Sequence, residues 1–328
     1  MTPRPTISLR AHAKVNLALS VGPPDGRGYH PIASWMVPLD LHDALRIERL
    51  PDGCAPVLER AWAADAPKPA PFDWDAESDL TLRALRRLES HIGRALPARL
   101  VLCKRTPVGG GLGGGSSDAA AALVGLNALF QLGLGAPELR ALAFALGSDI
   151  PFFIDKLDPR GGPAREPCRP ALVAGLGDAI TRLAPPTGSG APLLLLLPPF
   201  GCPTGAVYKA YDRLGPRALD AERIARLAER ARAEGSIDSG SLFNDLAAPA
   251  ETVAPELPDL RRRAAAVLGV PVLVTGSGST LFALPAETRE GRRGTGEAGA
   301  GQRWARESAE RIRSSVPDLV PVPACMRE

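Results

Sequence analysis

The sequence predicts a protein of mixed α and β structure. Residues 5–21 alternate apolar side chains with others, as a strand with one buried face does. Residues 80–96 instead carry leucines at helical spacing, and a long, largely apolar helix pattern follows at 119–132. With 328 residues, of which 45% are hydrophobic and 23% are charged, the chain has enough apolar material for a core and enough length for two domains.

Glycine and proline, 34 of each, mark the loops between the expected elements. Ser78 and Asp79 are the cap candidates for the helix at 80–96. The elements expected in the N-terminal half are, in order, a strand (5–21), a loop (23–28), further strand (32–50), a surface excursion rich in Pro, Ala and Asp (51–75), a helix (80–96), a short strand (100–102) and two helices (119–132 and 136–146).

A loop at 159–170 is expected to separate the two halves of the chain. The segment 286–303 is rich in Gly, Arg and Glu without periodicity, which predicts a mobile insertion. The elements expected in the C-terminal half are, in order, strands (171–183 and 193–197), helices (204–214, 220–234 and 256–268), a strand, a Gly-Ser loop and a strand (270–284), and a last helix (303–315).

The composition argues against several functional classes. A formal net charge of only +3 does not indicate a nucleic-acid binder. The longest aliphatic run, Leu193 to Leu197, is too short to cross a bilayer, and the N-terminus lacks the pattern of a signal peptide. The five cysteines are widely spaced and form no CxxC pair, which argues against a disulfide framework or a structural zinc site. We therefore expect a cytoplasmic protein without a nucleic-acid or membrane partner.

The most specific feature is a glycine-rich segment, Pro107–Ser117, which leads directly into the helix at 119–132. Its six glycines let the backbone approach an anion, and the first turn of the helix offers free N–H groups and the positive end of the helix dipole. The segment therefore predicts a phosphate-binding loop, although it matches neither the Walker A nor the dinucleotide-binding pattern. A flexible linker is the alternative, against which Leu112 in the middle of the run argues. A second loop, Thr275–Thr280, is either a plain turn or a second wall of the same anion site.

Several polar residues are candidates for a site, each with a plainer alternative. Lys14 and Asn16 share the strand face opposite Val15, as in a polar pocket wall, but an exposed edge lysine fits the pattern equally. Asp149 lies beside the apolar run Ile-Pro-Phe-Phe-Ile, which favours a general base, although turns of this composition are common. Tyr29-His30 places two aromatic rings on a loop, which suits a flat heterocycle or is an ordinary loop pair.

Taken together, these segments resemble the GHMP kinases, and within them the branch that phosphorylates a cytidylated methylerythritol. The double glycine triplet and the Gly-Tyr-His loop are the most specific parts of the resemblance. The resemblance implies an α+β fold of two GHMP domains, 1–165 and 166–328, with the active site in the cleft between them. The matching segments are AKVNLALSV, DGRGYHPI, KRTPVGGGLGGGSSDAAAALVGLN, LGSDIPFFI, PTGAVYKAYDRL, LFNDLAAP and VTGSGSTLFAL.

The resemblance also implies a reaction. ATP with Mg²⁺ would phosphorylate the 2-hydroxyl of the methylerythritol unit, in the non-mevalonate route to isoprenoid precursors. Asp149 would take the hydroxyl proton, Lys14 would keep that carboxylate ionised, and Ser117 is the best candidate for a magnesium ligand. The residues expected to bind ATP are Lys104 (near the adenine), Pro107, Val108, Gly109, Gly110, Gly111, Leu112, Gly113, Gly114, Gly115, Ser116 and Ser117. The residues expected to bind the substrate are Asn16, Thr204, His30 at the cytosine edge, and Tyr29 and Tyr208 on either side of the base, with Gly276, Ser277, Gly278 and Ser279 closing the far wall.

Two other functions fit parts of the sequence. A kinase acting on homoserine or mevalonate would not need the Tyr29-His30 loop, because those substrates carry no base to stack on. A catalytically silent nucleotide-binding protein would not need Lys14 together with Asp149. Asp79 stands where the family often has an asparagine in the adenine pocket, so no nucleotide contact is carried over to it.

Overall fold

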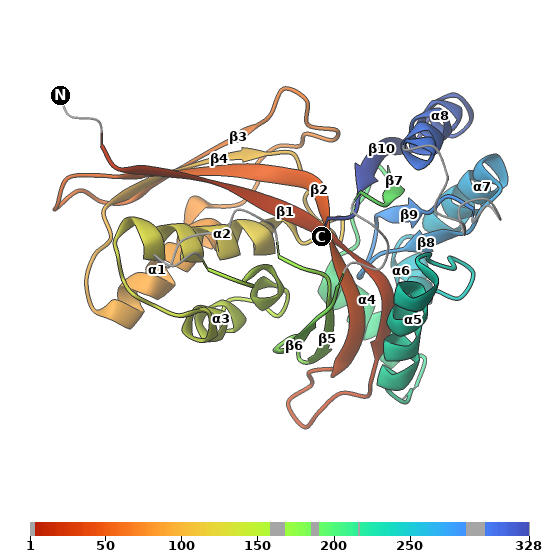
Figure 1. Cartoon of the computed structure of the whole chain (residues 1–328), viewed down its shortest axis with the longest axis horizontal. Helices are drawn as coiled ribbons and strands as arrows, with labels where there is room; N and C mark the ends of the chain where they lie inside the picture. The colour runs from red at the N-terminus through yellow and green to blue at the C-terminus, as the bar shows by residue number, and fades with distance from the viewer. Residues whose placement is uncertain (1–3, 158–167, 185–189, 216, 287–298, 328) are drawn as a thin grey trace. The chain divides into compact units, whose positions relative to one another are not determined.

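The computed structural model of the chain describes residues 4–157, 168–184, 190–215, 217–286 and 299–327 (Figure 1). The expected domain boundary between residues 165 and 166 lies outside these ranges. The chain forms two compact units, each assembled from separate stretches of sequence. The first unit comprises Met1–Ala13, Leu41–Val108 and Gly113–Cys168, and the second comprises Lys14–Asp40, Gly109–Leu112 and Arg169–Glu328.

Two long strands contribute residues to both units. They are β1 (Thr6–Val21) and β2 (Ile32–Arg49), which agree closely with the strands predicted at 5–21 and 32–50. Within the first unit, β2 pairs antiparallel with β4 (Ala98–Lys104), and β4 pairs in parallel with β3 (Val57–Trp62). The prediction of a surface excursion at 51–75 is therefore wrong for β3. Its side chains alternate only between exposed and half-buried positions, a pattern too weak to identify a strand before its partner is known.

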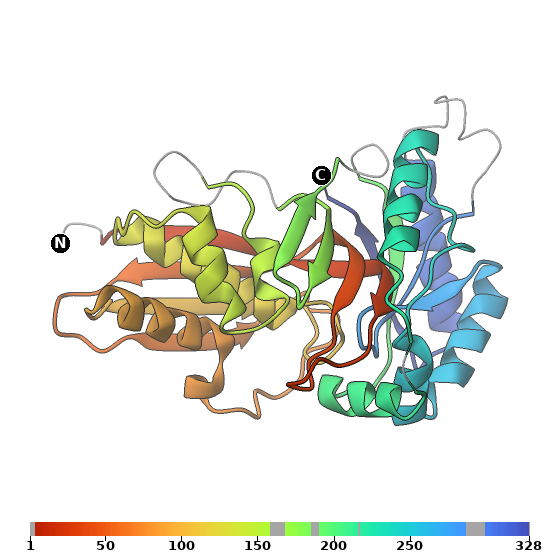
Figure 2. The same ribbon diagram turned by 90° about the horizontal axis from the view of Figure 1, so that it is seen from below.

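The helices of the first unit cover one face of these strands (Figure 2). They are α1 (Leu80–Ile92), α2 (Gly114–Leu129) and α3 (Ala136–Phe144). α1 ends before the predicted residue 96 because Gly93 adopts the left-handed conformation, with φ of 70°. α2 packs so closely on the strands that a Cβ atom added at Gly125 would lie 2.7 Å from Ile47 Cδ1. The apolar, small-residue composition of α2 thus suits a helix buried against the sheet.

The second unit contains two groups of strands. The N-terminal part of β2 pairs antiparallel with β5 (Ala171–Gly175), and β5 pairs antiparallel with β6 (Ala179–Arg182). A separate antiparallel sheet has the strand order β10–β7–β9–β8. Its members are β7 (Pro192–Leu197), β8 (Val272–Val274), β9 (Leu281–Ala283) and β10 (Val320–Cys325).

Two helices of the second unit pack on this sheet. α8 packs on β7 and β10, and α7 packs on β8. α8 begins at Ala300, so the predicted mobile insertion at 286–303 is wrong for its last residues, while 287–298 lie outside the described part of the chain. No helix of the described ranges is long and apolar enough to span a membrane. The helices are α4 (Thr204–Asp212), α5 (Ala221–Glu234), α6 (Ala247–Val253), α7 (Leu257–Leu268) and α8 (Ala300–Ser315).

The sequence did not predict α6 or β10, and prolines are the reason in both cases. α6 has only seven residues and contains Pro249. β10 contains Pro321 and Pro323, which normally argue against a strand. β10 tolerates them because it is the edge strand of its sheet. The N–H of Cys325 points away from β7, because it donates to the side-chain oxygen Oδ1 of Asp40 at 2.8 Å. Since N–H groups alternate in direction along a strand, both prolines face that same side, where β7 needs no donor.

Candidate active site

The glycine-rich segment joins the end of β4 to the start of α2. Gly109, Gly111 and Gly113 have φ values of 71°, 75° and 70°, in the left-handed region that other residues rarely adopt. Gly113 is also the N-cap of α2 and has no side chain to occupy the N–H groups of the first turn. Those N–H groups, together with the helix dipole, are therefore available to an anion such as a phosphate.

The two serines of this segment differ in their surroundings. Ser117 is buried, and its hydroxyl donates to the Gly114 carbonyl at 2.9 Å. Ser116 keeps part of its surface exposed, so it is the serine whose side chain is more accessible to a ligand. Within the described ranges, no group of three or more His, Cys, Asp and Glu side chains is placed to hold a metal ion.

Leu112 anchors the middle of the segment. Its side chain is 1% exposed, and its carbonyl oxygen accepts the N–H of Lys14 at 2.9 Å. A linker would not be buried and bonded in this way, so the flexible-linker alternative is wrong.

The second glycine loop, Thr275–Thr280, lies against the first. The Thr280 N–H donates to the Gly110 carbonyl at 3.3 Å. A Cβ atom added at Gly111 would lie 2.8 Å from the Thr275 oxygen and 3.0 Å from the Gly278 oxygen. This close approach of two backbones makes the loop more than a plain turn and is what two walls of one site require.

Thr204 and Phe200 connect the start of α4 to the second loop. The hydroxyl groups of Thr204 and Ser277 are 2.9 Å apart, within hydrogen-bond distance. The Ser279 hydroxyl donates to the Phe200 carbonyl. The expected substrate residue Thr204 therefore lies beside the expected far wall.

Lys14 and Asn16 are both buried, with exposures of 3% and 4%, so the alternative of an exposed edge lysine is wrong. Lys14 Nζ donates to Asn16 Oδ1 at 2.7 Å, and Asn16 Nδ2 donates to the Ser34 hydroxyl at 2.7 Å. The Asn16 N–H donates to Thr275 Oγ1 at 2.8 Å. β1 thus presents an oriented ammonium group beside the second glycine loop.

The expected cytosine-binding residues lie on the loop after β1 and on α4. Tyr29 is 61% exposed, while the ring of His30 is buried with its centroid 5.2 Å from that of Tyr208. His30 Nδ1 lies 2.8 Å from the Gly22 oxygen, and Nε2 lies 3.1 Å from Asp212 Oδ1. Both ring nitrogens thus already have protein partners, so a contact from this side chain to a base would have to displace one of them.

Asp149 follows α3 and precedes the short 3-10 helix Ile150–Phe153 in the first unit. It is half-buried, beside the fully buried Ile150 and Phe152. Its carboxylate makes no capping hydrogen bond to the helix that it precedes. Asp149 does lie in a turn, closed by the Ile150 N–H, which donates to the Gly147 carbonyl at 3.2 Å, so the role of Asp149 as a general base stays a prediction.

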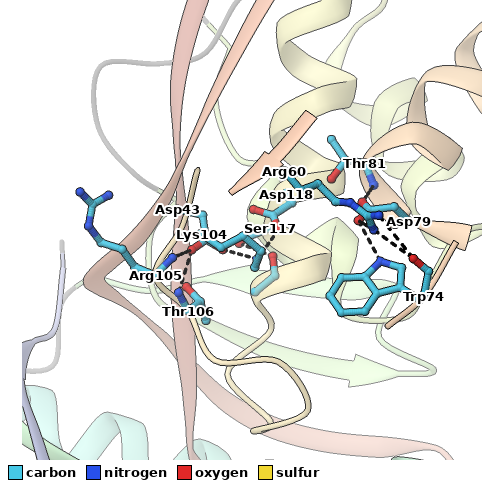
Figure 3. Close-up of polar contacts among 11 residues, drawn as sticks. Asp43, Arg60, Trp74, Asp79, Thr81, Lys104, Arg105, Thr106, Ser117 and Asp118 are labelled. Carbon is cyan, nitrogen blue, oxygen red and sulfur yellow. Dashed lines mark hydrogen bonds and ion pairs between the residues drawn. The ribbon is translucent and has the colours of Figure 1, made fainter. Parts of the chain in front are cut away.

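A buried ion cluster that the sequence did not reveal adjoins the glycine-rich segment (Figure 3). Lys104 Nζ lies 2.5 Å from Asp43 Oδ2 and 2.5 Å from Asp118 Oδ2. Asp43 Oδ1 also accepts the N–H groups of Arg105 and Thr106 at 2.5 and 2.7 Å. The cluster therefore ties β2 to the residues just before the segment and to α2 just after it. The sequence did offer one sign of this cluster. Asp118 directly precedes the apolar helix pattern at 119–132, and a charged group buried there needs a partner of opposite charge.

The charges of this cluster do not balance, because two carboxylates face one ammonium group. Burial raises the pKa of the Asp118 carboxyl well above its usual range, and Asp43 adds to the rise, although Lys104 opposes it. Burial disfavours the charged form of Lys104, but the two carboxylates outweigh it and raise its pKa. Within the cluster, burial thus favours the protonated form of Asp118, while the two carboxylates favour the charged form of Lys104. With its side chain held here, the expected contact of Lys104 with adenine stays a prediction.

Asp79 has an internal role at the start of α1 (Figure 3). Its Oδ1 caps the helix by accepting the Thr81 N–H at 2.9 Å. Its Oδ2 accepts the indole N–H of Trp74 at 3.0 Å, and Arg60 forms an ion pair with it at 3.4 Å. An acid at this position therefore fixes the preceding segment to the helix.

The chain is similar in sequence to known kinases. Residues 79–156 match the family model of the GHMP kinases N terminal domain. The chain is 34% identical over 289 residues to 4-diphosphocytidyl-2-C-methyl-D-erythritol kinase of Pelotomaculum thermopropionicum, a match that covers 87% of this chain and 91% of that protein. It is 35% identical over 291 residues to the kinase of the same name from Caulobacter vibrioides, covering 87% of this chain and 91% of that one.

A solved structure gives the same assignment. A crystal structure of 4-(cytidine 5'-diphospho)-2C-methyl-D-erythritol kinase superposes with a TM-score of 0.71 at 31% identity, over 98% of this chain and 100% of the other. Homoserine kinase from Cytophaga hutchinsonii reaches a TM-score of 0.65 at 14% identity, over 100% of this chain and 96% of the other, a likeness of fold only. Because these kinases match in sequence over most of both chains, this chain belongs to the 4-diphosphocytidyl-2-C-methyl-D-erythritol kinase family of the GHMP kinases.

Proposed function

We propose that this protein transfers the γ-phosphoryl group of ATP to the 2-hydroxyl of 4-diphosphocytidyl-2-C-methyl-D-erythritol, in the non-mevalonate route to isoprenoid precursors. The observation that carries the proposal is the likeness to kinases of that name over most of the chain. The aromatic residues Tyr29 and Tyr208, with His30 beside Tyr208, support a substrate that contains a base. Homoserine and mevalonate have no such group.

The proposed roles of the chain's residues follow the chemistry of phosphoryl transfer, which depends mainly on positioning and charge neutralisation. The first-turn N–H groups of α2 bind phosphate oxygens, and the Lys14 ammonium, oriented by Asn16, offsets negative charge. Asp149 takes the proton of the 2-hydroxyl group while the oxygen of that hydroxyl group bonds to the γ-phosphorus. The bond from that phosphorus to the bridging oxygen breaks, and ADP leaves.

Magnesium belongs to this proposal as the partner of ATP. It binds phosphate oxygens and keeps several waters, so it needs few protein ligands. Ser117 is the candidate ligand, because donating its hydroxyl proton to the Gly114 carbonyl leaves oxygen lone pairs for a cation, but its side chain is buried, so the ion would have to reach it through the loop. The bound ion would neutralise charge on the phosphates.

An assay of ADP release tests the proposal with three acceptors: the cytidylated methylerythritol, homoserine and mevalonate. We expect turnover only with the first. Turnover with homoserine or mevalonate in its place would show that the assignment of the substrate is wrong.

Asp149→Asn tests the proposed base and separates a kinase from a silent nucleotide-binding protein. The variant keeps the shape of the side chain but cannot accept the proton, so kcat should fall about 10²–10⁴-fold. Calorimetric titration with ATP should give an unchanged affinity. Normal phosphorylation by the variant would refute the role of Asp149.

A further inference from the structure

Asn244 lies behind the second glycine loop and uses its whole carboxamide to hold it. Nδ2 donates to the Val274 carbonyl at 2.8 Å and to the Gly276 carbonyl at 2.8 Å. Oδ1 accepts the Leu246 N–H at 2.9 Å. The two donors and one acceptor needed here are those of an amide, and a carboxylate of the same shape lacks the donors.

The backbone that carries Asn244 is itself fixed to β1. The Leu19 N–H donates to the Phe243 carbonyl at 2.9 Å, and the Asp245 N–H donates to the Leu19 carbonyl at 3.0 Å. The Asp245 side chain accepts the Val21 N–H at 2.9 Å. Asn244 is therefore a rigid connection from β1 to the second loop.

The two carbonyls that Asn244 holds flank Thr275, the residue that meets the polar end of β1. Thr275 Oγ1 accepts the Asn16 N–H at 2.8 Å. The next residue, Gly276, packs so closely that an added Cβ atom would lie 3.3 Å from Asn16 Oδ1 and 3.5 Å from Lys14 Nζ. A small shift of this peptide would therefore press on the pair that orients the ammonium group.

We propose that Asn244 is a positioning residue for phosphoryl transfer. It fixes the second glycine loop against β1, and the loop in turn keeps the side chains of Lys14 and Asn16 in place. The expected loss of kcat rests on the proposed function. The expected loosening of the loop rests only on the hydrogen bonds that Asn244 makes to it. The hydrogen bonds of the Asn244 side chain go to Val274, Gly276 and Leu246, so it acts through the loop.

Asn244→Asp is the test variant, because it places a carboxylate oxygen against two carbonyl oxygens. Asn127→Asp is its matched control. Asn127 makes the same kind of amide clamp in the first unit, donating to the Leu134 carbonyl at 3.1 Å and accepting the Leu134 N–H at 3.0 Å. Any general cost of changing a hydrogen-bonded amide to an acid should appear in both variants.

The kinetic measurement is the separation of kcat from KM, alongside the melting temperature. We expect kcat of Asn244→Asp to fall about 10–100-fold, since misplacement of a reacting group by about 1 Å is that costly, with KM for ATP changed far less. Asn127→Asp should lower the melting temperature similarly but keep kcat. Equal kcat in the two variants would overturn the proposal.

A second measurement does not depend on the substrate. Hydrogen exchange of the amides at 274–280 and at Asn16 should become faster in Asn244→Asp and not in Asn127→Asp. Unchanged protection of these amides in Asn244→Asp would overturn the proposal, whatever the activity. If wild-type protein fails to phosphorylate the cytidylated methylerythritol while the exchange result holds, the proposed function fails and the clamp stands.

Discussion

The carboxyl groups of Asp43 and Asp118 face the same Lys104 ammonium, yet they should contribute differently to stability. Asp43 accepts three donors, whereas Asp118 is the carboxyl whose pKa burial raises. We expect Asp43→Asn to lower the free energy of unfolding by about 3 kcal/mol, as breaking a buried ion pair does. Asp118→Asn should cost less, because burial already disfavours the charged form of the carboxyl that it replaces. Urea denaturation of the two variants measures the difference, and equal losses would contradict this account.

The raised pKa of Asp118 also predicts how stability depends on pH. The folded state binds this proton more tightly than the unfolded state does. The contribution of Asp118 protonation to the free energy of unfolding is therefore fully present below the ordinary aspartate pKa of about 4. It is lost as the pH rises through the raised pKa of Asp118. Over that range the free energy of unfolding should fall more steeply for wild-type protein than for Asp118→Asn, which cannot titrate. Denaturation at a series of pH values gives the free energy of unfolding as a function of pH. Parallel curves for the two proteins would count against a raised pKa of Asp118.

At the scale of elements, the contact between the two glycine loops is the most testable feature. Gly109 and Gly111 have similar left-handed φ values of 71° and 75°, so alanine at either position should cost about 1 kcal/mol in backbone strain. Only Gly111→Ala would also place a Cβ atom 2.8 Å from the Thr275 oxygen, whereas the space at Gly109 is open within 4 Å. Overpacking adds about 1–3 kcal/mol, so Gly111→Ala should be the more destabilising variant in urea denaturation. A Gly109→Ala variant that is equally unstable would show that strain alone explains the effect.

At the scale of the whole molecule, ATP should stabilise the folded chain by mass action. A ligand at 100 times its Kd adds about 2.7 kcal/mol, which corresponds to a rise in Tm of roughly 4 °C for a chain of this length. Asp149→Asn should show the same rise, since its proposed role is in proton transfer and not in nucleotide binding. Differential scanning calorimetry with and without ATP measures both proteins. Absence of a rise in wild-type protein would contradict nucleotide binding.

The local features of the sequence were sufficient to predict most elements and the glycine-rich loop before α2. Alternation identified β1, helical spacing identified α1, and six glycines before an apolar helix predicted the loop that precedes α2. These properties depend on residues close together in the chain, so they can be read before any tertiary contact is known. The second glycine loop was a candidate only because the first existed, and its packing against Gly111 needed the structure.

Only the tertiary structure decided which segments meet. β3 is a strand because β4 lies beside it, and β10 accommodates two prolines because it is the edge strand of its sheet. One partner of Lys104 is equally non-local, since Asp43 is 61 residues away in the chain. Asn244 stood in a segment with a clear family resemblance, but its role depends on carbonyl groups some 30 residues further on. The physical reason is common to all of these cases: a buried charge, an amide or a strand edge is satisfied by whatever the fold brings to it, and no local pattern records that partner.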